Sequence, residues 1–285
     1  METKKELYTG WKIWKPTNEE LAEFYTANKA TVDVKENEYL IIKDAKTDDL
    51  LEIYKKKANK FVHINGAAIK IKDPKDNRMN TVYNPRNNEQ RCAFDMLHDQ
   101  ESTVKIITGT WGTGKSLLLI TAALEALREK KFEKIVWIRN NVDVKDTKDL
   151  GALPGDAKEK LLPFLGPFID HVGGEKRALK MIEEGQLEIQ PLQFLRGRDI
   201  KNAIIMCSES ENLSKEHIQL IIARAAEGSN VWMDGDIIQR DKVSFEQSRG
   251  IETMIEKLTG NPLFGHVKLI KSERSATAAL ADKLD

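Results

Sequence analysis

The chain has 285 residues, of which 40% are hydrophobic, and its 45 basic and 45 acidic side chains balance. This length suits one full domain with a small additional unit better than two full domains. The neutral balance excludes a global positive field of the kind that by itself indicates binding to nucleic acid or to an anionic membrane, so any such site must be local.

Other bulk features favour a soluble, cytoplasmic protein without membrane association. Cys92 and Cys207 lie far apart in apolar neighbourhoods, so we expect packed core residues rather than a disulfide or a zinc site. No apolar run approaches the length of a transmembrane helix, and the first residues are polar, unlike a signal peptide.

The first part of the chain is predicted to form a small α+β unit. A polar helix is expected over Glu19–Asn28, and strands are expected over Glu38–Ile42 and Phe61–Ile64. The run Lys55–Lys57 could contact phosphates, but a solvated helix face explains three consecutive lysines equally well. A turn-rich stretch then favours a domain boundary near Tyr83, with residues 1–83 before it and 84–285 after it.

The most specific motif is the octapeptide Gly109–Ser116, GTWGTGKS. It follows a predicted buried strand, Val104–Thr108, and precedes an apolar helix that opens at Leu117, as a phosphate-binding loop requires. In such a loop the backbone N–H groups converge on phosphate oxygens, Lys115 reaches the outer phosphates and Ser116 offers its hydroxyl to Mg²⁺. The alternative is a glycine-rich turn that matches by chance. The residues expected to bind a nucleotide are Gly112, Thr113, Gly114, Lys115, Ser116 and Leu117.

Beyond the loop, buried strands alternate with helical segments such as Lys215–Ala226. Right-handed crossovers between such strands give a mainly parallel sheet whose loops meet at the carboxyl edge, so catalytic residues should follow strands. The predicted strands are Lys134–Ile138, Asn202–Cys207, Asn230–Met233 and Val267–Ile270.

Three polar segments follow these strands. Glu209 comes where a phosphate-loop enzyme presents an aspartate for Mg²⁺ and a glutamate for water, but the residue before it is Ser208. Gln239 could sense the terminal phosphate, and Arg274 supplies a cation suited to charge in the transition state. Each segment alone is also typical of turns and helix caps.

Taken in order, the motifs resemble the PhoH-like family of ATPases, whose fold is similar to a helicase superfamily 1 motor domain. The resemblance covers nearly everything from Pro85 onward and implies an α/β fold, with a RecA-like P-loop NTPase domain of mainly parallel sheet after the small α+β unit. Besides the phosphate loop, the matching segments are Pro85–Gln90, Leu150–Asp156, Arg196–Arg198, Gly235–Asp241 and Glu273–Ser275.

Carried over position by position, the resemblance implies ATP and Mg²⁺ as cofactors, with Gln90 recognising adenine. The implied catalytic residues are Lys115, Glu209, Gln239 and Arg274, and the implied metal ligands are Ser116 and Glu209. The segment Asn37–Ile64 also resembles the connector that precedes the ATPase in relatives with a PIN nuclease domain, and we expect no room for that nuclease here.

The chain departs from the family pattern at one position that matters. The family's aspartate-glutamate-alanine-glutamine-asparagine segment appears here as Ser208–Asn212, so the metal-side aspartate is replaced by Ser208. A neutral hydroxyl supplies no charge, and we expect weaker Mg²⁺ binding and slow or absent hydrolysis, with Glu211 as a partial compensation.

A single motor-type domain leaves a nucleotide half exposed unless another subunit covers it. The resemblance implies a homo-oligomer, a hexameric ring, in which Arg274, Arg139, Arg196 or Arg198 reaches a neighbour's nucleotide or instead braces a local loop. The leading hypothesis is an oligomeric ATPase that acts on RNA or single-stranded DNA. The alternative is a degenerate assembly protein in which ATP stabilises contacts without turnover, and a small-molecule kinase fits the later motifs poorly.

Overall fold

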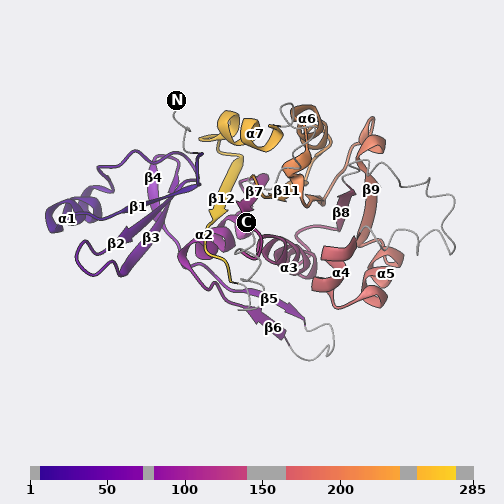
Figure 1. Ribbon diagram of the computed structural model, residues 1–285, viewed down its shortest axis with the longest axis horizontal. Coiled ribbons are helices and arrows are strands. Elements are labelled where there is room, and N and C mark those ends of the chain that lie inside the picture. Colours follow the sequence, from indigo (N-terminus) through magenta and orange to yellow (C-terminus); the bar gives the residue numbers. More distant parts are fainter. Residues whose placement is uncertain (1–6, 73–79, 140–164, 238–248, 274–285) are drawn as a thin grey trace, which may run out of the picture.

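A computed structural model describes residues 7–72, 80–139, 165–237 and 249–273. Its centre is a sheet of six parallel strands in the order β12-β7-β11-β10-β8-β9 (Figure 1). The strands of this central sheet are β7 (Val104–Gly109), β8 (Lys134–Arg139), β9 (Leu187–Pro191), β10 (Ala203–Cys207), β11 (Asn230–Gly235) and β12 (Phe264–Leu269). The four predicted strands of this region and the strand before the phosphate loop are thus confirmed.

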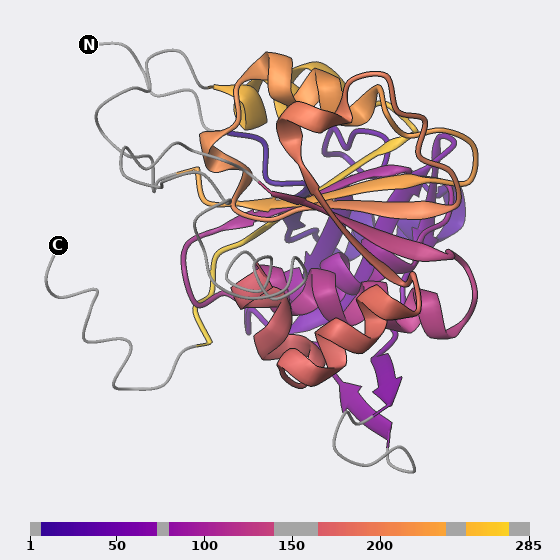
Figure 2. The ribbon, with the colours of Figure 1, turned by 90° about the vertical axis from the view of Figure 1, so that its right-hand side faces the viewer.

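Helices cover both faces of this sheet (Figure 2). Strands such as β10 are buried along their whole length, as expected for a parallel sheet between two helical layers. On one face lie α2 (Asn88–His98), α3 (Lys115–Arg128), α4 (Gly166–Val172) and α5 (Glu175–Glu183), and on the other lie α6 (Lys215–Ile222) and α7 (Gly250–Leu258). The α/β fold with a mainly parallel sheet is therefore confirmed.

The strand order determines where the functional loops meet. Strand β7 lies between β12 and β11, and β10 is the next strand beyond β11. All of these strands run in the same direction, so the loops that follow them open at the same edge of the sheet. The phosphate loop after β7 thereby lies beside the segments that follow β10, β11 and β12.

The small N-terminal unit contains a second sheet, of order β1-β2-β3-β4, and one helix (Figure 1). Phe24 of the helix is buried among the rings of Trp14, Tyr54 and Phe61, which it contacts edge-on. Thr17 begins the helix with a capping box. The elements are β1 (Trp11–Trp14), α1 (Asn18–Ala27), β2 (Tyr39–Lys43), β3 (Leu50–Lys57) and β4 (Lys60–His63).

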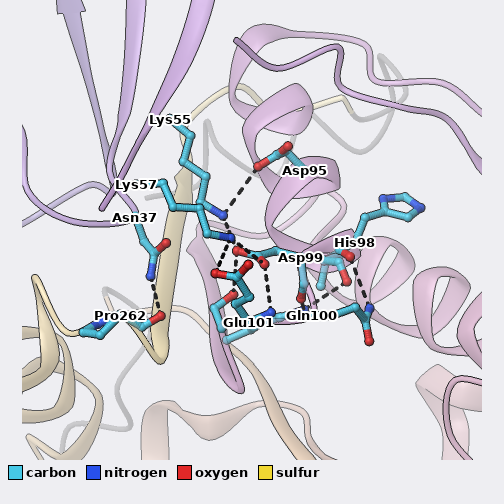
Figure 3. A network of polar contacts seen from close by, with 12 residues as sticks. Asn37, Lys55, Lys57, Asp95, His98, Asp99, Gln100, Glu101 and Pro262 are labelled. Carbon is cyan, nitrogen blue, oxygen red and sulfur yellow. Dashed lines mark hydrogen bonds and ion pairs between the residues drawn. The ribbon is translucent and has the colours of Figure 1, made fainter. Parts of the chain in front are cut away.

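The structure corrects the interpretation of Lys55–Lys57 as a solvated helix face, because these residues end strand β3. Lys55 is only 4% exposed, and its ammonium lies 2.5 Å from Asp99 at the end of α2 (Figure 3). Lys57 contacts the other oxygen of Asp99 at 3.1 Å. Burial alone would raise the pKa of Asp99, but the two lysines hold it far below its ordinary value. The run therefore joins the unit to the main domain.

A hairpin connects the two sheets. Strands β5 (Ile69–Lys72) and β6 (Asn80–Tyr83) form it, and β5 packs against α3, where the N–H of Lys70 donates to Glu125 at 2.6 Å. The boundary at Tyr83 stays a prediction.

Cys92 and Cys207 are fully buried free cysteines, as expected. Among the described helices, none combines the length and the apolar character needed to cross a membrane.

Candidate functional site

The phosphate loop needs its glycines for backbone reasons. Gly112 and Gly114 have φ values of +71° and +91°, which side chains rarely permit. At Gly109 an added Cβ would lie 2.4 Å from the carbonyl oxygen of Leu269 on β12, so no larger residue fits there. Gly114 begins α3 without a side-chain cap. The first N–H groups of this fourteen-residue helix therefore suit an anion such as phosphate.

The loop's polar side chains are held by its own backbone. The ammonium of Lys115 donates to the carbonyls of Gly109 at 2.7 Å and of Thr110 at 2.9 Å. Thr113 is buried, and its hydroxyl donates to the same Thr110 carbonyl at 2.8 Å. These contacts fix the lysine over the loop, where it can meet phosphate oxygens.

A cleft of about 550 Å³ opens over the loop. Its walls come from the phosphate loop, the start of α2, the segments after β10 and β11, and Glu273 after β12. The predicted nucleotide-binding residues Gln90, Gly112, Thr113, Gly114, Lys115, Ser116 and Leu117 all line it. The structure thus brings together residues that the sequence separates into two motifs, although their contact with a nucleotide stays a prediction.

Gln90 connects these two motifs. Its side chain is 5% exposed, and its Oε1 accepts a hydrogen bond from the N–H of Arg86 at 2.9 Å. Its Nε2 donates to the carbonyl of Thr113 at 3.3 Å. The amide therefore ties the predicted adenine-side segment to the phosphate loop.

Three acidic residues, Glu209, Glu211 and Asp234, form what we call the acidic wall of the cleft. The first of them is Glu209. This residue follows β10, is exposed, and has a left-handed backbone with φ of +54°, which is uncommon for a residue with a side chain. Its N–H donates to Asp234 at 2.8 Å, and this bond supports the unusual conformation. Such strain concentrates at functional sites, and Glu209 lines the same cleft as the phosphate loop.

Asp234 is a residue of the cleft to which the sequence analysis assigned no role. It lies near the end of β11, is 2% exposed and lines the cleft. The hydroxyl of Ser208 donates to its two oxygens at 3.0 and 3.2 Å. Ser208 was expected to leave the metal side without a carboxylate, and the structure places Asp234 of the neighbouring strand against it. The available signal was an acidic residue directly after the buried run Asn230–Met233. The expected weakening of Mg²⁺ binding stays a prediction.

Opposing effects act on the pKa of Asp234. Burial raises this pKa above its ordinary value. Hydrogen bonds from the N–H of Glu209 and the Ser208 hydroxyl lower it, as do the nearby Ser116 hydroxyl and the charge of Lys115. Each of these groups stabilises the ionised carboxylate, which accepts hydrogen bonds and attracts cations.

Glu211 lies deeper in the same wall. Burial raises its pKa to about 7, and the charges of Asp234 and Glu209 add to this shift, while backbone hydrogen bonds such as that from the N–H of Asp236 oppose it. The N–H of Asp236 is 3.2 Å from its Oε2. Glu211 is therefore only partly ionised near neutral pH and supplies less negative charge than a solvent-exposed glutamate.

The segment after β12 also reaches the phosphate loop. The N–H of Glu273 donates to the carbonyl of Gly112 at 2.9 Å, and the side-chain amide of Asn87 donates to the Glu273 carboxylate at 3.1 Å. The predicted residues Gln239 and Arg274 lie outside the described residues, as do residues 150–156 and the side chain of Arg139. Their roles stay predictions.

The two arginines of the Arg196–Arg198 segment differ. The guanidinium of Arg198 lies 2.5 Å from Glu188 on β9, so it braces this edge of the sheet. Arg196 is exposed. Neither arginine lines the cleft.

The donor set of the cleft fits Mg²⁺, which prefers oxygen ligands. Oxygen ligands are available from the hydroxyl of Ser116 and the carboxylates of Glu209 and Asp234. Within the described parts of the chain, no group of three or more acidic, histidine or cysteine side chains forms a metal cage. This arrangement suits Mg²⁺ carried on phosphates and held by few protein groups.

Comparison with protein families agrees with the geometry. The model of a family described as "PhoH-like protein" matches residues 82–280, which include the phosphate loop and the acidic wall. The chain belongs to the PhoH-like family. It is thus a member of a P-loop NTPase family, which is consistent with ATP binding.

Curated relatives show the same relationship. The protein PhoH2 of Mycolicibacterium smegmatis is 34% identical over 202 residues, which cover 70% of this chain and 46% of that protein. The protein PhoH2 of Bacillus subtilis is 29% identical over 295 residues, which cover 98% of this chain and 64% of that protein. The chain thus spans about half to two thirds of the length of these relatives.

Solved structures resemble the chain more distantly. The Pif1 helicase from Candida albicans superposes with a TM-score of 0.37 at 16% identity, covering 70% of this chain and 42% of that one. A DnaC helicase loader superposes with a TM-score of 0.33 at 15% identity, covering 66% of this chain and 93% of that one.

Proposed function

We propose that this PhoH-like protein binds Mg²⁺ and ATP in the cleft and hydrolyses the γ-phosphate. One observation carries the proposal: the phosphate loop lines the same cleft as Glu209 and the buried Asp234. A triphosphate on the loop would extend from the N-terminus of α3 toward this acidic wall. Phosphoryl transfer needs this combination of an anion site with carboxylates beyond it.

The polar residues of the cleft have distinct roles in this proposal. Lys115 neutralises the outer phosphates, and the Ser116 hydroxyl contacts the metal ion. When bound, Mg²⁺ supplies positive charge against the phosphate oxygens. Glu209, which is exposed in the cleft, orients and deprotonates the attacking water. Gln239 and Arg274 are proposed to sense the γ-phosphate and to stabilise charge in the transition state.

We further propose that the ATPase forms a hexameric ring of identical subunits and acts on RNA or single-stranded DNA. Among the described residues that line the cleft, Arg86 is the single arginine, and Arg198 is engaged with Glu188. An arginine from a neighbouring subunit would complete the charge that phosphoryl transfer requires. Arg196, which is exposed, is available for such a contact.

Steady-state ATP hydrolysis tests the enzyme. We expect Lys115→Ala and Glu209→Gln each to lower the rate at least about 100-fold, because one removes phosphate binding and the other the base. Glu209→Gln should still bind ATP. A native rate no higher than that of Lys115→Ala, with ATP binding retained, would leave the non-hydrolysing assembly protein as the correct function.

Two measurements test the partners. Mass determination in solution with and without ATP should detect the ring, and a monomer under both conditions would contradict it. Hydrolysis should rise when single-stranded RNA or DNA is added, and an unchanged rate with both polymers would remove nucleic acid from the proposal.

A further inference from the structure

Asp234 has a position that suits a metal carboxylate better than the position of Ser208. Strand β11, which carries Asp234, pairs directly with β7, the strand that leads into the phosphate loop. Strand β10, which leads into Ser208, is one strand further from β7. In the register of β11 and β7, Asp234 lies opposite Ile107, two residues before the loop begins at Gly109. An acidic side chain on β11 therefore needs less reach toward Ser116.

Ser208 and Asp234 occupy equivalent levels of adjacent strands. The register pairs Cys207 with Met233, so the next residue on each strand is Ser208 and Asp234 respectively. The two side chains meet, with the Ser208 hydroxyl 3.0 Å from one oxygen of Asp234 and 3.2 Å from the other. A serine on one strand and an aspartate on the next thus share one location.

The other neighbours of Asp234 indicate that it faces a cation rather than only a turn. Ser116, whose hydroxyl is proposed to contact the metal ion, lines the same cleft as Asp234, and this hydroxyl lowers the pKa of Asp234. Asp234 also borders the cleft, although it is only 2% exposed. Besides accepting the N–H of Glu209, Asp234 therefore shares the cleft with the phosphate loop.

On the basis of the ATP binding proposed above, we propose that Asp234 supplies the metal-side carboxylate that the family otherwise carries at the position of Ser208. Ser208 is then a positioning residue, because its hydroxyl donates to the carboxylate of Asp234 and restrains it at the edge of the cleft. Groups that orient a metal-binding side chain in this way contribute to metal affinity. The carboxylate has moved to the adjacent strand and is not lost.

The variant Asp234→Asn separates a metal role from a structural one. Asparagine keeps an oxygen that accepts the N–H of Glu209, but it removes the negative charge. Ser208→Ala is the matched control, because it removes one hydrogen bond to the carboxylate and leaves the charge. The exchange variant S208D/D234S returns a carboxylate to the end of β10.

Titration of a fluorescent ATP analogue in EDTA and in rising Mg²⁺ measures metal dependence without requiring turnover. We expect native protein to bind the analogue more tightly as Mg²⁺ rises. Asp234→Asn should need about 10- to 100-fold more Mg²⁺ for the same gain, while its affinity in EDTA stays within about twofold of native. The exchange variant should recover most of the native response, and Ser208→Ala should lose less than Asp234→Asn. Binding of Mn²⁺ followed by electron paramagnetic resonance should give the same order.

The outcomes distinguish this inference from the proposed function. If native protein binds the analogue with a Mg²⁺ response that Asp234→Asn retains in full, the assignment of Asp234 is wrong and ATP binding stands. If native protein binds no analogue under any condition, the proposed function fails and the assignment fails with it. Melting curves identify a variant that does not fold. In that case the exchange variant decides, supporting the assignment if its Mg²⁺ response is native and overturning it if the response is absent.

Discussion

Replacing Ser208 by aspartate tests the contact between Ser208 and Asp234 directly. The substitution restores the residue that the family pattern has at this position, so sequence comparison alone predicts a gain of function. The structure predicts a loss of stability, because the new carboxylate would lie against the buried carboxylate of Asp234. Two carboxylates that share one site cannot both ionise freely.

The magnitude follows from the separation of the charges. The Ser208 hydroxyl is 3.0 Å from the nearer oxygen of Asp234, so the two carboxylate charges would be about 4 Å apart. At an effective dielectric constant of about 20, their repulsion is about 4 kcal/mol. Protonation limits this cost: it requires about 5 kcal/mol at pH 7.5 but only about 1.5 kcal/mol at pH 5, for a carboxyl with an ordinary pKa near 4. The loss should therefore be about 4 kcal/mol at pH 7.5 and about 1.5 kcal/mol at pH 5.

The sign of the pH dependence is also fixed. The repulsion raises the pKa of one carboxyl in the folded state, so the folded protein binds more protons than the unfolded chain, and stability falls as pH rises above about 4. Urea unfolding at the two pH values measures the difference, with Ser208→Asn as the uncharged control of similar size. Equal losses at both pH values, or an equal loss in Ser208→Asn, would refute the electrostatic explanation. Mg²⁺ with ATP should recover part of the loss at pH 7.5.

Three further predictions concern other contacts. Lys55→Met should lower the free energy of unfolding by about 3 kcal/mol, because it leaves the largely buried Asp99 with one lysine. Lys57→Met, at a more exposed side chain, should lower it by about 1 kcal/mol or less. Urea titrations that show equal losses for the two variants would contradict this prediction. Glu211→Gln should stabilise the protein by about 2 kcal/mol at pH 8 and little at pH 5, because a pKa raised to about 7 makes ionisation of Glu211 above neutral pH costly. Melting curves in which the stability gain does not depend on pH would contradict this prediction. Gly109→Ala should cost about 1–3 kcal/mol and weaken nucleotide binding, since its Cβ would meet a carbonyl oxygen at 2.4 Å; thermal melting that matches the native protein would contradict the observed loop geometry.

The sequence could predict what contiguous residues determine. The phosphate loop is a local motif: its glycines, Lys115 and Ser116 are spaced by the backbone itself, so strand, loop and helix follow from one short segment. Buried parallel strands are likewise visible as apolar runs, and five of the six strands in the central sheet were predicted. The missing strand, β9, is half-buried and carries polar residues, so its run is not continuous.

Only the tertiary structure decided which side chains meet across strands. The contact of Ser208 with Asp234 depends on the pairing of β10 with β11, and that of Gln90 with Thr113 depends on how α2 packs beside β7. These contacts join residues 26 and 23 positions apart, and a shift in the register of β10 and β11 would remove the first of them. Ser208 in the sequence therefore indicates a missing carboxylate, whereas the folded chain places the carboxylate of Asp234 against it from the adjacent strand.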